Sequence, residues 1–353
     1  MKRKMTREIM AGNVGIGGNH PISVQSMLCS PNGDFEAAKK QCEALCAAGC
    51  DLIRLAVMDE ASLSVVKQLK QVIPAPLVAD IQFDYRLALG AIEAGIDKIR
   101  LNPGNIGSEE RVKMVVEKAG EKGIPIRVGV NAGSVSQRIL QKYGSACPEA
   151  LVEEAMGQIA ILESCGFYDI AVSLKASSVP MMLESYRLMS QKVDYPLHLG
   201  VTEAGTAYSG TVKSAVGIGA LLSEGIGDTI RVSLTADPVE EIRAAKEILA
   251  ALELDKSRAK LVSCPTCARC SVDLISIANQ VSERLSEVKK PIKIAVMGCV
   301  VNGPGEARDA DIGITGAKGE GLIFKNGDII RRVKEQEIVS ALFEELKKMD
   351  VLA

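Results

Sequence analysis

Eight short runs rich in β-branched residues recur through the first two thirds of the chain, and helix-length segments separate them. Near-continuous apolar strands that alternate with helices are typical of a parallel sheet covered on both faces. Eight such units within about 230 residues match a (β/α)8 barrel of the TIM type. The sequence therefore predicts an α/β barrel, with a doubly wound open sheet as the alternative. The eight runs occupy residues 22–27, 51–57, 76–81, 97–102, 125–130, 169–175, 196–201 and 228–234.

A second pattern begins after the eighth run. Asp237, Pro238 and Glu240 provide a cap, a proline at the first helical position and an acid in the first turn, which together predict the last helix of the barrel. The polar stretch 253–260 then reads as a linker. Beyond it the sequence predicts a small α+β domain with helices at 271–287 and 335–348 and a hairpin at 321–333. We expect two domains, 1–255 and 260–353.

Charge and hydropathy exclude several classes of protein. The chain has 42 basic and 44 acidic residues, so its net charge of −2 argues against a nucleic-acid or anionic-membrane partner. It contains no apolar segment of transmembrane or signal-peptide length, and we expect a cytoplasmic protein. Six of the ten cysteines are scattered through apolar, helix-like contexts and are predicted to be buried small hydrophobic residues. These six are Cys29, Cys42, Cys46, Cys50, Cys147 and Cys165.

Cationic side chains gather at the ends of the predicted strands, where barrel enzymes carry their chemistry. A charge inside an apolar strand must be paired or hydrated. Arginine offers a planar fork that suits phosphate oxygens, so the pattern predicts a diphosphate site. The alternative is that some of the cations pair with Asp80 or Glu203 and are structural. The cations are Arg54, Arg100, Arg127, Lys175 and Arg231, with Asn102, Asn131, Ser173 and Ser233 nearby.

Few residues can transfer protons in the predicted barrel. His20 and His198 are the only two histidines, and His198 lies within a strand run, where it can equally be a core residue. Glu203 follows the same run in a loop at the functional face. We therefore prefer Glu203 as the residue that handles protons.

The second domain carries a group of cysteines. Three lie in "CPTCARC" (264–270), and Cys299 follows after a predicted helix and strand in "GCVVNGPGE", which ends at Glu306. Three thiolates with a non-thiolate fourth ligand would leave one iron of an iron–sulfur cluster labile. A glutamate oxygen suits such a soft site less well than a thiolate and can leave it. The alternative is a structural zinc site with Cys270 as its fourth thiolate.

Several longer stretches together resemble one family. They include "VADIQFDYRLAL", "RLNPGNIG", "PIRVGVNAGS", "LHLGVTEAG", "SCPTC" and "GCVVNGPGEA". In this order they resemble the 4-hydroxy-3-methylbut-2-enyl diphosphate synthases of the non-mevalonate isoprenoid pathway, from about residue 6 to residue 345.

The resemblance implies a fold, a cofactor and a reaction. The fold is a (β/α)8 barrel followed by a [4Fe-4S] domain that resembles those of sulfite and nitrite reductases. The cluster ligands would be Cys264, Cys267, Cys299 and Glu306. The family forms homodimers in which the cluster domain of one subunit caps the barrel of the other. Its substrate is 2-C-methyl-D-erythritol 2,4-cyclodiphosphate. Ferredoxin or flavodoxin donates two electrons, which reach the substrate through the cluster.

With this reaction in view, we also predict roles for single residues. Glu306 would leave the cluster to admit substrate, and Glu203 would supply a proton for the loss of water. Two positions depart from the expected pattern: Gln82 stands where the family often has histidine, and Cys270 is an extra thiol. Two competing interpretations are a zinc-stabilised barrel that binds a phosphorylated metabolite and a relative of siroheme reductases. The substrate-binding residues would be Arg54, Arg100, Arg127, Asn131 and Lys175, with Ser263 and Asn302 from the cluster side.

Overall fold

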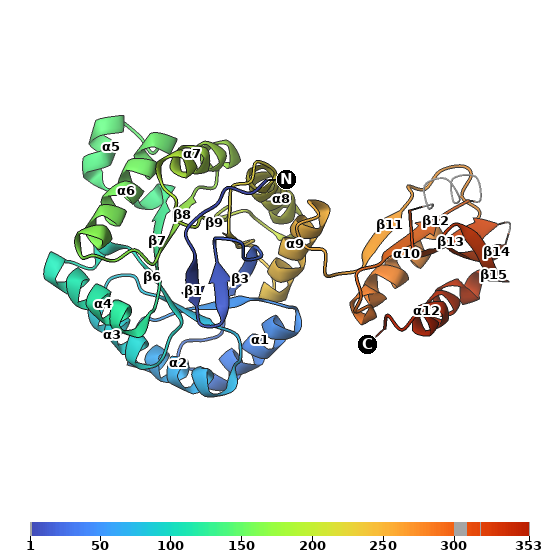
Figure 1. Ribbon diagram of the computed structural model, residues 1–353, viewed down its shortest axis with the longest axis horizontal. Helices are drawn as coiled ribbons and strands as arrows, with labels where there is room; N and C mark the ends of the chain where they lie inside the picture. The colour runs from blue at the N-terminus through green and yellow to red at the C-terminus, as the bar shows by residue number, and fades with distance from the viewer. Residues whose placement is uncertain (1, 300–308, 318, 353) are drawn as a thin grey trace. The chain divides into compact units, whose positions relative to one another are not determined.

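The computed structural model describes residues 2–299, 309–317 and 319–352. The chain divides into two compact units, Met1–Leu254 and Asp255–Ala353 (Figure 1). The first unit contains a parallel eight-stranded sheet wrapped by helices, and the second contains a separate five-stranded sheet.

All eight predicted runs form strands of one parallel sheet in the order β8-β7-β6-β5-β4-β3-β10-β9. A parallel bridge between Val172 and Leu197 brings β8 beside β9, so the two ends of this order meet. The barrel is confirmed, and the doubly wound alternative is wrong. The last two strands are shorter than predicted. The strands are β3 (Ser23–Met27), β4 (Leu52–Ala56), β5 (Leu77–Asp80), β6 (Lys98–Leu101), β7 (Ile126–Asn131), β8 (Ile170–Lys175), β9 (His198–Leu199) and β10 (Thr229–Ile230).

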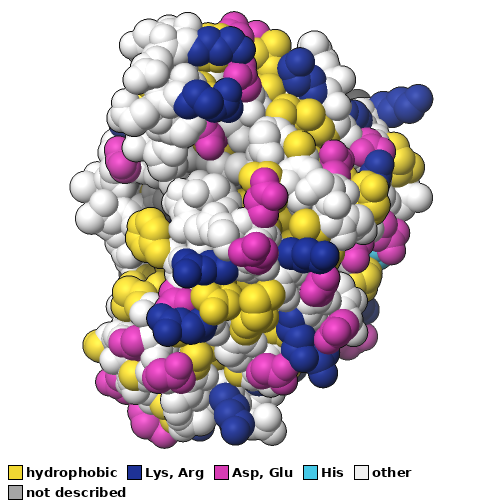
Figure 2. All heavy atoms as spheres, turned by 90° about the vertical axis from the view of Figure 1, so that its left-hand side faces the viewer, with side chains coloured by type: hydrophobic (Ala, Val, Ile, Leu, Met, Phe, Trp, Pro, Cys, Tyr) yellow, Lys and Arg dark blue, Asp and Glu magenta, His cyan; other side chains and the backbone are white. Residues whose placement is uncertain are grey.

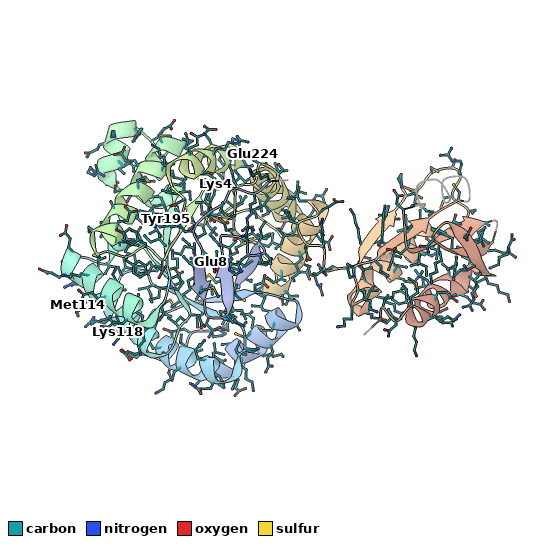
Figure 3. All side chains as sticks on the ribbon, viewed as in Figure 1. Lys4, Glu8, Met114, Lys118, Tyr195 and Glu224 are labelled. Carbon is teal, nitrogen blue, oxygen red and sulfur yellow. The ribbon has the colours of Figure 1, made fainter. Side chains whose placement is uncertain are left out.

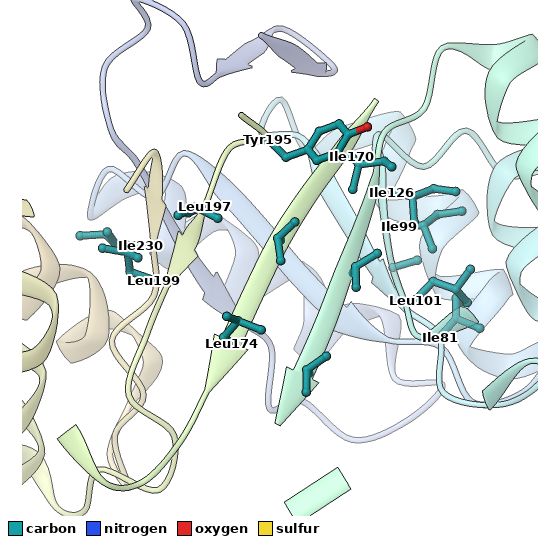
Figure 4. Packing of buried hydrophobic residues seen from close by; sticks show 14 of the residues in the cluster. Ile81, Ile99, Leu101, Ile126, Ile170, Leu174, Tyr195, Leu197, Leu199 and Ile230 are labelled. Atoms are coloured by element: carbon teal, nitrogen blue, oxygen red, sulfur yellow. The ribbon is translucent and has the colours of Figure 1, made fainter. Parts of the chain in front are cut away.

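Helices surround the barrel and bury the apolar faces of the strands. Figure 4 shows part of this packing, in which Ile99, Leu101 and Leu174 belong to one cluster of buried side chains. Asp237 caps α9 by accepting a hydrogen bond from the N–H of Val239, as predicted. The helices are α1 (Phe35–Ala47), α2 (Glu60–Val72), α3 (Tyr85–Glu93), α4 (Glu109–Lys122), α5 (Gln137–Tyr143), α6 (Pro148–Ser164), α7 (Val179–Lys192), α8 (Ala207–Ser223) and α9 (Pro238–Ala251).

A short antiparallel hairpin, β1 (Ile9–Ala11) and β2 (Val14–Ile16), closes the N-terminal end of the barrel. Its side chains Ile9, Ala11 and Ile16 pack against the inward-facing residues at the starts of three strands, which are Leu52, Val78 and Ala171. The sequence did not predict this hairpin, because strands of three residues give too short an alternation to detect. We call these six residues the apolar floor.

The segment before the hairpin is tied to the loop after α7. Lys4 Nζ donates a hydrogen bond of 2.7 Å to the carbonyl oxygen of Val193, and the Arg7 guanidinium lies 4.9 Å from the centre of the Tyr195 ring (Figure 3). Among residues 2–299, 309–317 and 319–352, no helix is both long and apolar enough to cross a membrane.

The second unit has a mixed sheet in the order β11-β12-β13-β14-β15. The first three strands are parallel and the last two pair antiparallel, with Asn326 and Gly327 at positive φ in the turn of the predicted hairpin. Ile277 and Leu342 from the helices pack with Ile294 of the sheet. The elements are β11 (Lys260–Ser263), α10 (Leu274–Glu283), β12 (Lys293–Met297), β13 (Ile312–Ala317), β14 (Glu320–Lys325), β15 (Asp328–Lys334) and α12 (Ile338–Lys348).

Both predicted helices of this unit are shorter than expected, since 3-10 turns occupy Arg284–Glu287 after α10 and Glu335–Glu337 before α12. The helix expected from residue 271 begins at Leu274, because Asp273 is its cap and accepts a hydrogen bond from the N–H of Ser276. Residues 264–273 therefore remain outside regular helices and strands, and they carry three of the cysteines.

Candidate functional site

The C-terminal ends of the barrel strands enclose a polar cavity of about 100 Å³. The structure brings together all five cations that the strand ends predicted, together with Asn131. Lys175 ends β8 and Arg231 follows β10, whereas Arg54, Arg100 and Arg127 lie within β4, β6 and β7. Long side chains from five parallel strands therefore converge on one cavity inside the barrel. The cavity is lined by Arg54, Arg100, Arg127, Asn131, Ser173, Lys175, Thr202, Arg231 and Ser233.

Two carboxylates partly neutralise the cations. Asp80 pairs with Arg54 at 2.8 Å and with Arg100 at 3.3 Å, so its predicted structural pairing is confirmed. Burial tends to raise the pKa of Asp80, but the charges of Arg54 and Arg100 outweigh burial and lower the pKa. Asp80 is therefore a buried, ionised counter-charge.

The second carboxylate was missed by the sequence analysis. Glu241 in the first turn of α9 lies 3.4 Å from Arg231 and accepts a hydrogen bond of 2.8 Å from the hydroxyl of Ser26. It also accepts from the N–H of Leu234 at 3.1 Å. In the sequence, Glu241 is an ordinary acidic residue in the first turn of a helix. Its contact with Arg231 depends on the packing of α9 beside β3, which becomes apparent in the folded barrel.

Positive charge exceeds negative charge in the cavity. In the described part of the chain, Arg127 and Lys175 form no ion pair, although Arg127 Nη1 donates a 2.7 Å hydrogen bond to the Ser173 hydroxyl. Burial, and then the charges of Arg231, Arg127 and Arg54, hold the pKa of Lys175 well below its usual value. Five cations against two carboxylates make a site for an anion of more than one negative charge.

Glycines at two strand ends leave room for these side chains. A Cβ on Gly129 would lie 2.8 Å from Arg100 Nε, and a Cβ on Gly200 would lie 2.7 Å from the carbonyl oxygen of Arg231. The carbonyl of Gly129 accepts a hydrogen bond of 3.1 Å from Arg100. Both glycines thus permit a close approach that a larger residue would prevent.

Glu203 lies in the loop after β9, beside the cavity-lining Thr202. It is exposed, and its φ of 53° is left-handed. A non-glycine residue in this conformation costs about 1 kcal/mol, and such residues concentrate at functional sites. Glu203 is not among the residues that line the cavity, so its predicted role in proton transfer stays a prediction.

Neither histidine lies at the mouth. His198 is fully buried, its Nδ1 lies 3.3 Å from the Thr229 hydroxyl, and burial followed by the Arg127 and Lys175 charges holds its pKa well below the usual value. It is a neutral residue of the barrel interior. His20 pairs with Glu8 at 3.0 Å and lies against Gly15 of the hairpin, at the opposite end of the barrel.

On the outer face shown in Figure 2, basic and acidic side chains are interspersed. An example is Lys118 on α4, which pairs with Glu93 at 2.8 Å (Figure 3). This face therefore carries no extended patch of one charge, whereas the barrel cavity gathers five cations, as expected of a small-molecule site.

In the second unit, the cysteine loop is bonded to the strand end that precedes Cys299. Cys264 N–H donates to the Val296 carbonyl at 3.2 Å, and Cys264 Sγ accepts from the Gly298 N–H at 3.2 Å. Ser271 N–H donates to the Gly298 carbonyl at 3.0 Å. These bonds hold the cysteine loop against residues 296–298, so its thiols and Cys299 come from neighbouring segments.

The donor set fits an iron–sulfur cluster, because the cysteine loop and Cys299 supply thiolates, the ligands that such clusters take. The sulfur of Cys264 accepts a backbone N–H bond, and bonds of this kind tune iron–sulfur clusters. Among the described residues, no three histidine, cysteine or acidic side chains converge closely enough to hold a single metal ion. Cys267 is exposed, whereas Cys299 is 9% exposed.

The remaining predicted positions are distributed as follows. Asn302 and Glu306 lie outside the described residues. Ser263 ends β11 in the second unit, and its hydroxyl lies 3.4 Å from the Cys264 carbonyl oxygen. Gln82 follows β5 and is exposed. Cys270 donates to the Val272 carbonyl at 3.2 Å and faces Gly298, where a Cβ would lie 2.7 Å from its sulfur.

Comparisons with known proteins agree with this division of the chain. A family model described as the GcpE TIM-barrel domain matches residues 6–246, and one described as the GcpE protein C-terminal domain matches residues 260–348. A solved structure of 3-dehydroquinate dehydratase from Geobacillus kaustophilus matches 70% of this chain and 96% of its own at 17% identity with a TM-score of 0.52, which indicates a shared barrel fold.

Two curated relatives cover almost the whole chain. The protein from Caldanaerobacter subterraneus subsp. tengcongensis is 58% identical over 347 residues, which are 98% of each chain. The protein from Clostridium perfringens is 58% identical over 344 residues, which are 98% of this chain and 99% of its own. Both are named 4-hydroxy-3-methylbut-2-en-1-yl diphosphate synthase (flavodoxin). With both of its domains matched and relatives of this identity along its length, the chain belongs to the GcpE family.

Proposed function

We propose that this chain is a flavodoxin-dependent oxidoreductase that converts 2-C-methyl-D-erythritol 2,4-cyclodiphosphate to 4-hydroxy-3-methylbut-2-enyl diphosphate. The observation that carries the proposal is the buried cavity in which five cations face two carboxylates. A diphosphate is the anion that such a cavity suits, because arginine forks match phosphate oxygens. The names of the relatives support the product and favour flavodoxin over ferredoxin as the donor.

The overall reaction sets what the residues must do. The ring opens when the bond between carbon 2 and its phosphate oxygen breaks, and the hydroxyl on carbon 3 leaves as water. Two electrons and one proton enter, a carbon–carbon double bond forms, and the diphosphate gains one negative charge. The protein must therefore bind a diphosphate whose charge grows during the reaction, and it must deliver one proton.

Binding of the diphosphate falls to Arg54, Arg100, Arg127, Lys175 and Asn131. Arg127 and Lys175 are the cations without a carboxylate partner among the described residues, so they contribute most to offsetting the new charge. Cations already held in place need little reorganisation as the charge develops, which favours the transition state over the bound substrate.

Delivery of the proton falls to Glu203. Its carboxyl protonates the departing hydroxyl of the substrate, which leaves as water. Two observations support this role: Glu203 is next to the cavity-lining Thr202, and its left-handed backbone is held against a local energetic cost. Ser263 and Asn302 would contact the substrate from the cluster side.

The cysteine loop would hold a [4Fe-4S] cluster through Cys264, Cys267 and Cys299, with Glu306 as the fourth ligand. When bound, the cluster supplies the two electrons that it receives from flavodoxin. The domain 1–255 thus binds the diphosphate and the domain 260–353 holds the cluster. We infer a cytoplasmic homodimer in which the cluster domain of the partner subunit completes each barrel.

The test is anaerobic turnover of the cyclodiphosphate with a chemical reductant, with iron and sulfide measured on the same samples. Wild-type protein is expected to form 4-hydroxy-3-methylbut-2-enyl diphosphate, whereas Cys299→Ser is expected to lose both the cluster and turnover. If wild-type protein that carries iron and sulfide forms no product, the assigned substrate is wrong.

A further inference from the structure

A layer of buried polar side chains lies inside the barrel next to the apolar floor, and one of its members, Arg127, also lines the cationic cavity. Each of these side chains is at most 4% exposed, and each has at least one polar atom without a hydrogen-bond partner among the described residues. Arg127 bonds to Ser173 and His198 contacts Thr229 through their other nitrogen atoms. Arg127 is the one member of the layer to which the proposed function gives a role. Buried polar atoms without partners are costly and rare in native proteins. The layer consists of Ser23, Gln25, Lys98, Arg127 and His198.

Lys98 is the member of this layer with the clearest position. It is the first residue of β6, it is 0% exposed, and it pairs in register with Val78 of the apolar floor. Arg100 lies two residues further along the same strand, so it faces the same side of the sheet and lines the cavity. Lys98 therefore lies one layer beneath the anion site.

Lys98 has no counter-ion within the described residues. Its Nζ has no hydrogen-bond partner there. Asp80 is shared by Arg54 and Arg100, and Glu241 is engaged by Arg231, so the two carboxylates beside the cavity are already paired. The other ionisable groups that face the interior are Arg127 from β7, Lys175 from β8 and the neutral His198 from β9.

The charge state of Lys98 follows from this environment. Burial, and then the neighbouring charge of Arg127, lowers the pKa of Lys98 to about 7. A lysine in this condition is uncharged in mildly alkaline solution. A nearby anion raises the pKa of Lys98 again, because it supplies the negative charge that the barrel interior lacks.

We propose that Lys98 is a positioning residue that is uncharged in the anion-free barrel and takes up one proton from solvent when a diphosphate occupies the cavity above it. The proposal rests on the proposed function, which makes the diphosphate the ligand. It extends that function, because the diphosphate gains one negative charge when the ring opens. A proton on Lys98 adds one positive charge to the layer beneath.

The experiment measures proton uptake during binding of inorganic pyrophosphate to the cluster-loaded protein. Titration calorimetry at about pH 8 in two buffers of different ionisation enthalpy gives the number of protons taken up. Wild-type protein is expected to take up about one proton more than Lys98→Met. Protons exchanged by pyrophosphate itself and by the other groups of the cavity are common to both proteins and cancel in the difference.

Affinity provides a second readout that a merely structural role would not change. One additional bound proton makes the affinity for pyrophosphate depend more steeply on pH. Between about pH 7.5 and 8.5, the affinity of the wild type is expected to fall about tenfold more per pH unit than the affinity of Lys98→Met. Lys113→Met is the matched control, because Lys113 is exposed on α4 and pairs only within its helix, with Glu117 at 3.8 Å. It is expected to behave like the wild type.

The outcomes separate the two proposals. Equal proton uptake and equal pH slopes in wild type and Lys98→Met would overturn the role of Lys98 while leaving the diphosphate site intact. Failure of wild-type protein to bind pyrophosphate would instead overturn the diphosphate site. Lys98→Gln, which forms hydrogen bonds but cannot titrate, repeats the comparison if the methionine variant folds poorly.

Discussion

Asp80 accepts a hydrogen bond of 2.8 Å from Arg54 within the barrel, and this carboxylate is 4% exposed. The same carboxylate lies 3.3 Å from Arg100, so one buried negative charge holds two cations of the cavity in place. Asp80 is therefore a support for the anion site, whereas the two arginines that it holds line the cavity.

We expect Asp80→Asn to destabilise the protein by about 3–5 kcal/mol, because it leaves Arg54 and Arg100 without their buried counter-charge. Thermal unfolding with and without inorganic pyrophosphate measures the effect, and the anion is expected to restore part of the loss. The control is Asp84→Asn, which changes an exposed cap of α3 that pairs with Arg86. A similar loss in both variants would contradict the supporting role of Asp80.

The stability of the protein is expected to depend on pH through Lys98. Its pKa is about 7 in the folded state against 10.5 for an ordinary lysine, so between these values the unfolded chain binds more protons. The contribution of Lys98 to the free energy of unfolding therefore rises with pH across that window, by about 5 kcal/mol in all. This contribution is lowest below pH 7. Chemical unfolding of wild type and Lys98→Met at several pH values measures the difference, and identical pH profiles would contradict it.

Glu203→Gln is expected to lower kcat about 100-fold or more with little change in KM, since it removes a proton donor but keeps the shape of the loop. Steady-state kinetics measures this split. A variant with wild-type kcat would remove Glu203 from the mechanism.

Glu203→Gly tests the backbone at the same position. It relieves the left-handed conformation at φ 53° and is expected to stabilise the protein by up to about 1 kcal/mol while turnover falls. Glu253→Gly is the matched control, since Glu253 has φ 57° just after α9. It is expected to give a similar gain in unfolding temperature without loss of turnover.

Cys270→Ser is expected to retain iron and sulfide, whereas Cys267→Ser loses them. Cys270 donates a hydrogen bond to the Val272 carbonyl and lies against Gly298, which indicates a packing role for its thiol. Iron and sulfide analysis together with visible absorbance of the anaerobically prepared variants measures the difference. Loss of the cluster in Cys270→Ser would make Cys270 a ligand.

The periodicity of the sequence was sufficient to predict the barrel, because each buried parallel strand is a local apolar run. It was also sufficient to group the five cations, since barrel strands end at one rim. Glu241 could not be predicted as the partner of Arg231, because their contact depends on how α9 packs beside the first barrel strand. Lys98 was missed for a related reason: a lysine at the start of a strand run normally marks an exposed end, and here the hairpin covers it.

The apolar floor, to which the hairpin contributes Ile9, Ala11 and Ile16, has a consequence for how water and ions enter the barrel. Because these apolar side chains cover the far end, we expect solvent to enter the interior past the cations of the mouth. An anion bound at the mouth would then block this route, and it would separate Lys98 from bulk water after Lys98 has taken up its proton. Release of the product would reopen the route, and Lys98 could return its proton to solvent before the next substrate binds.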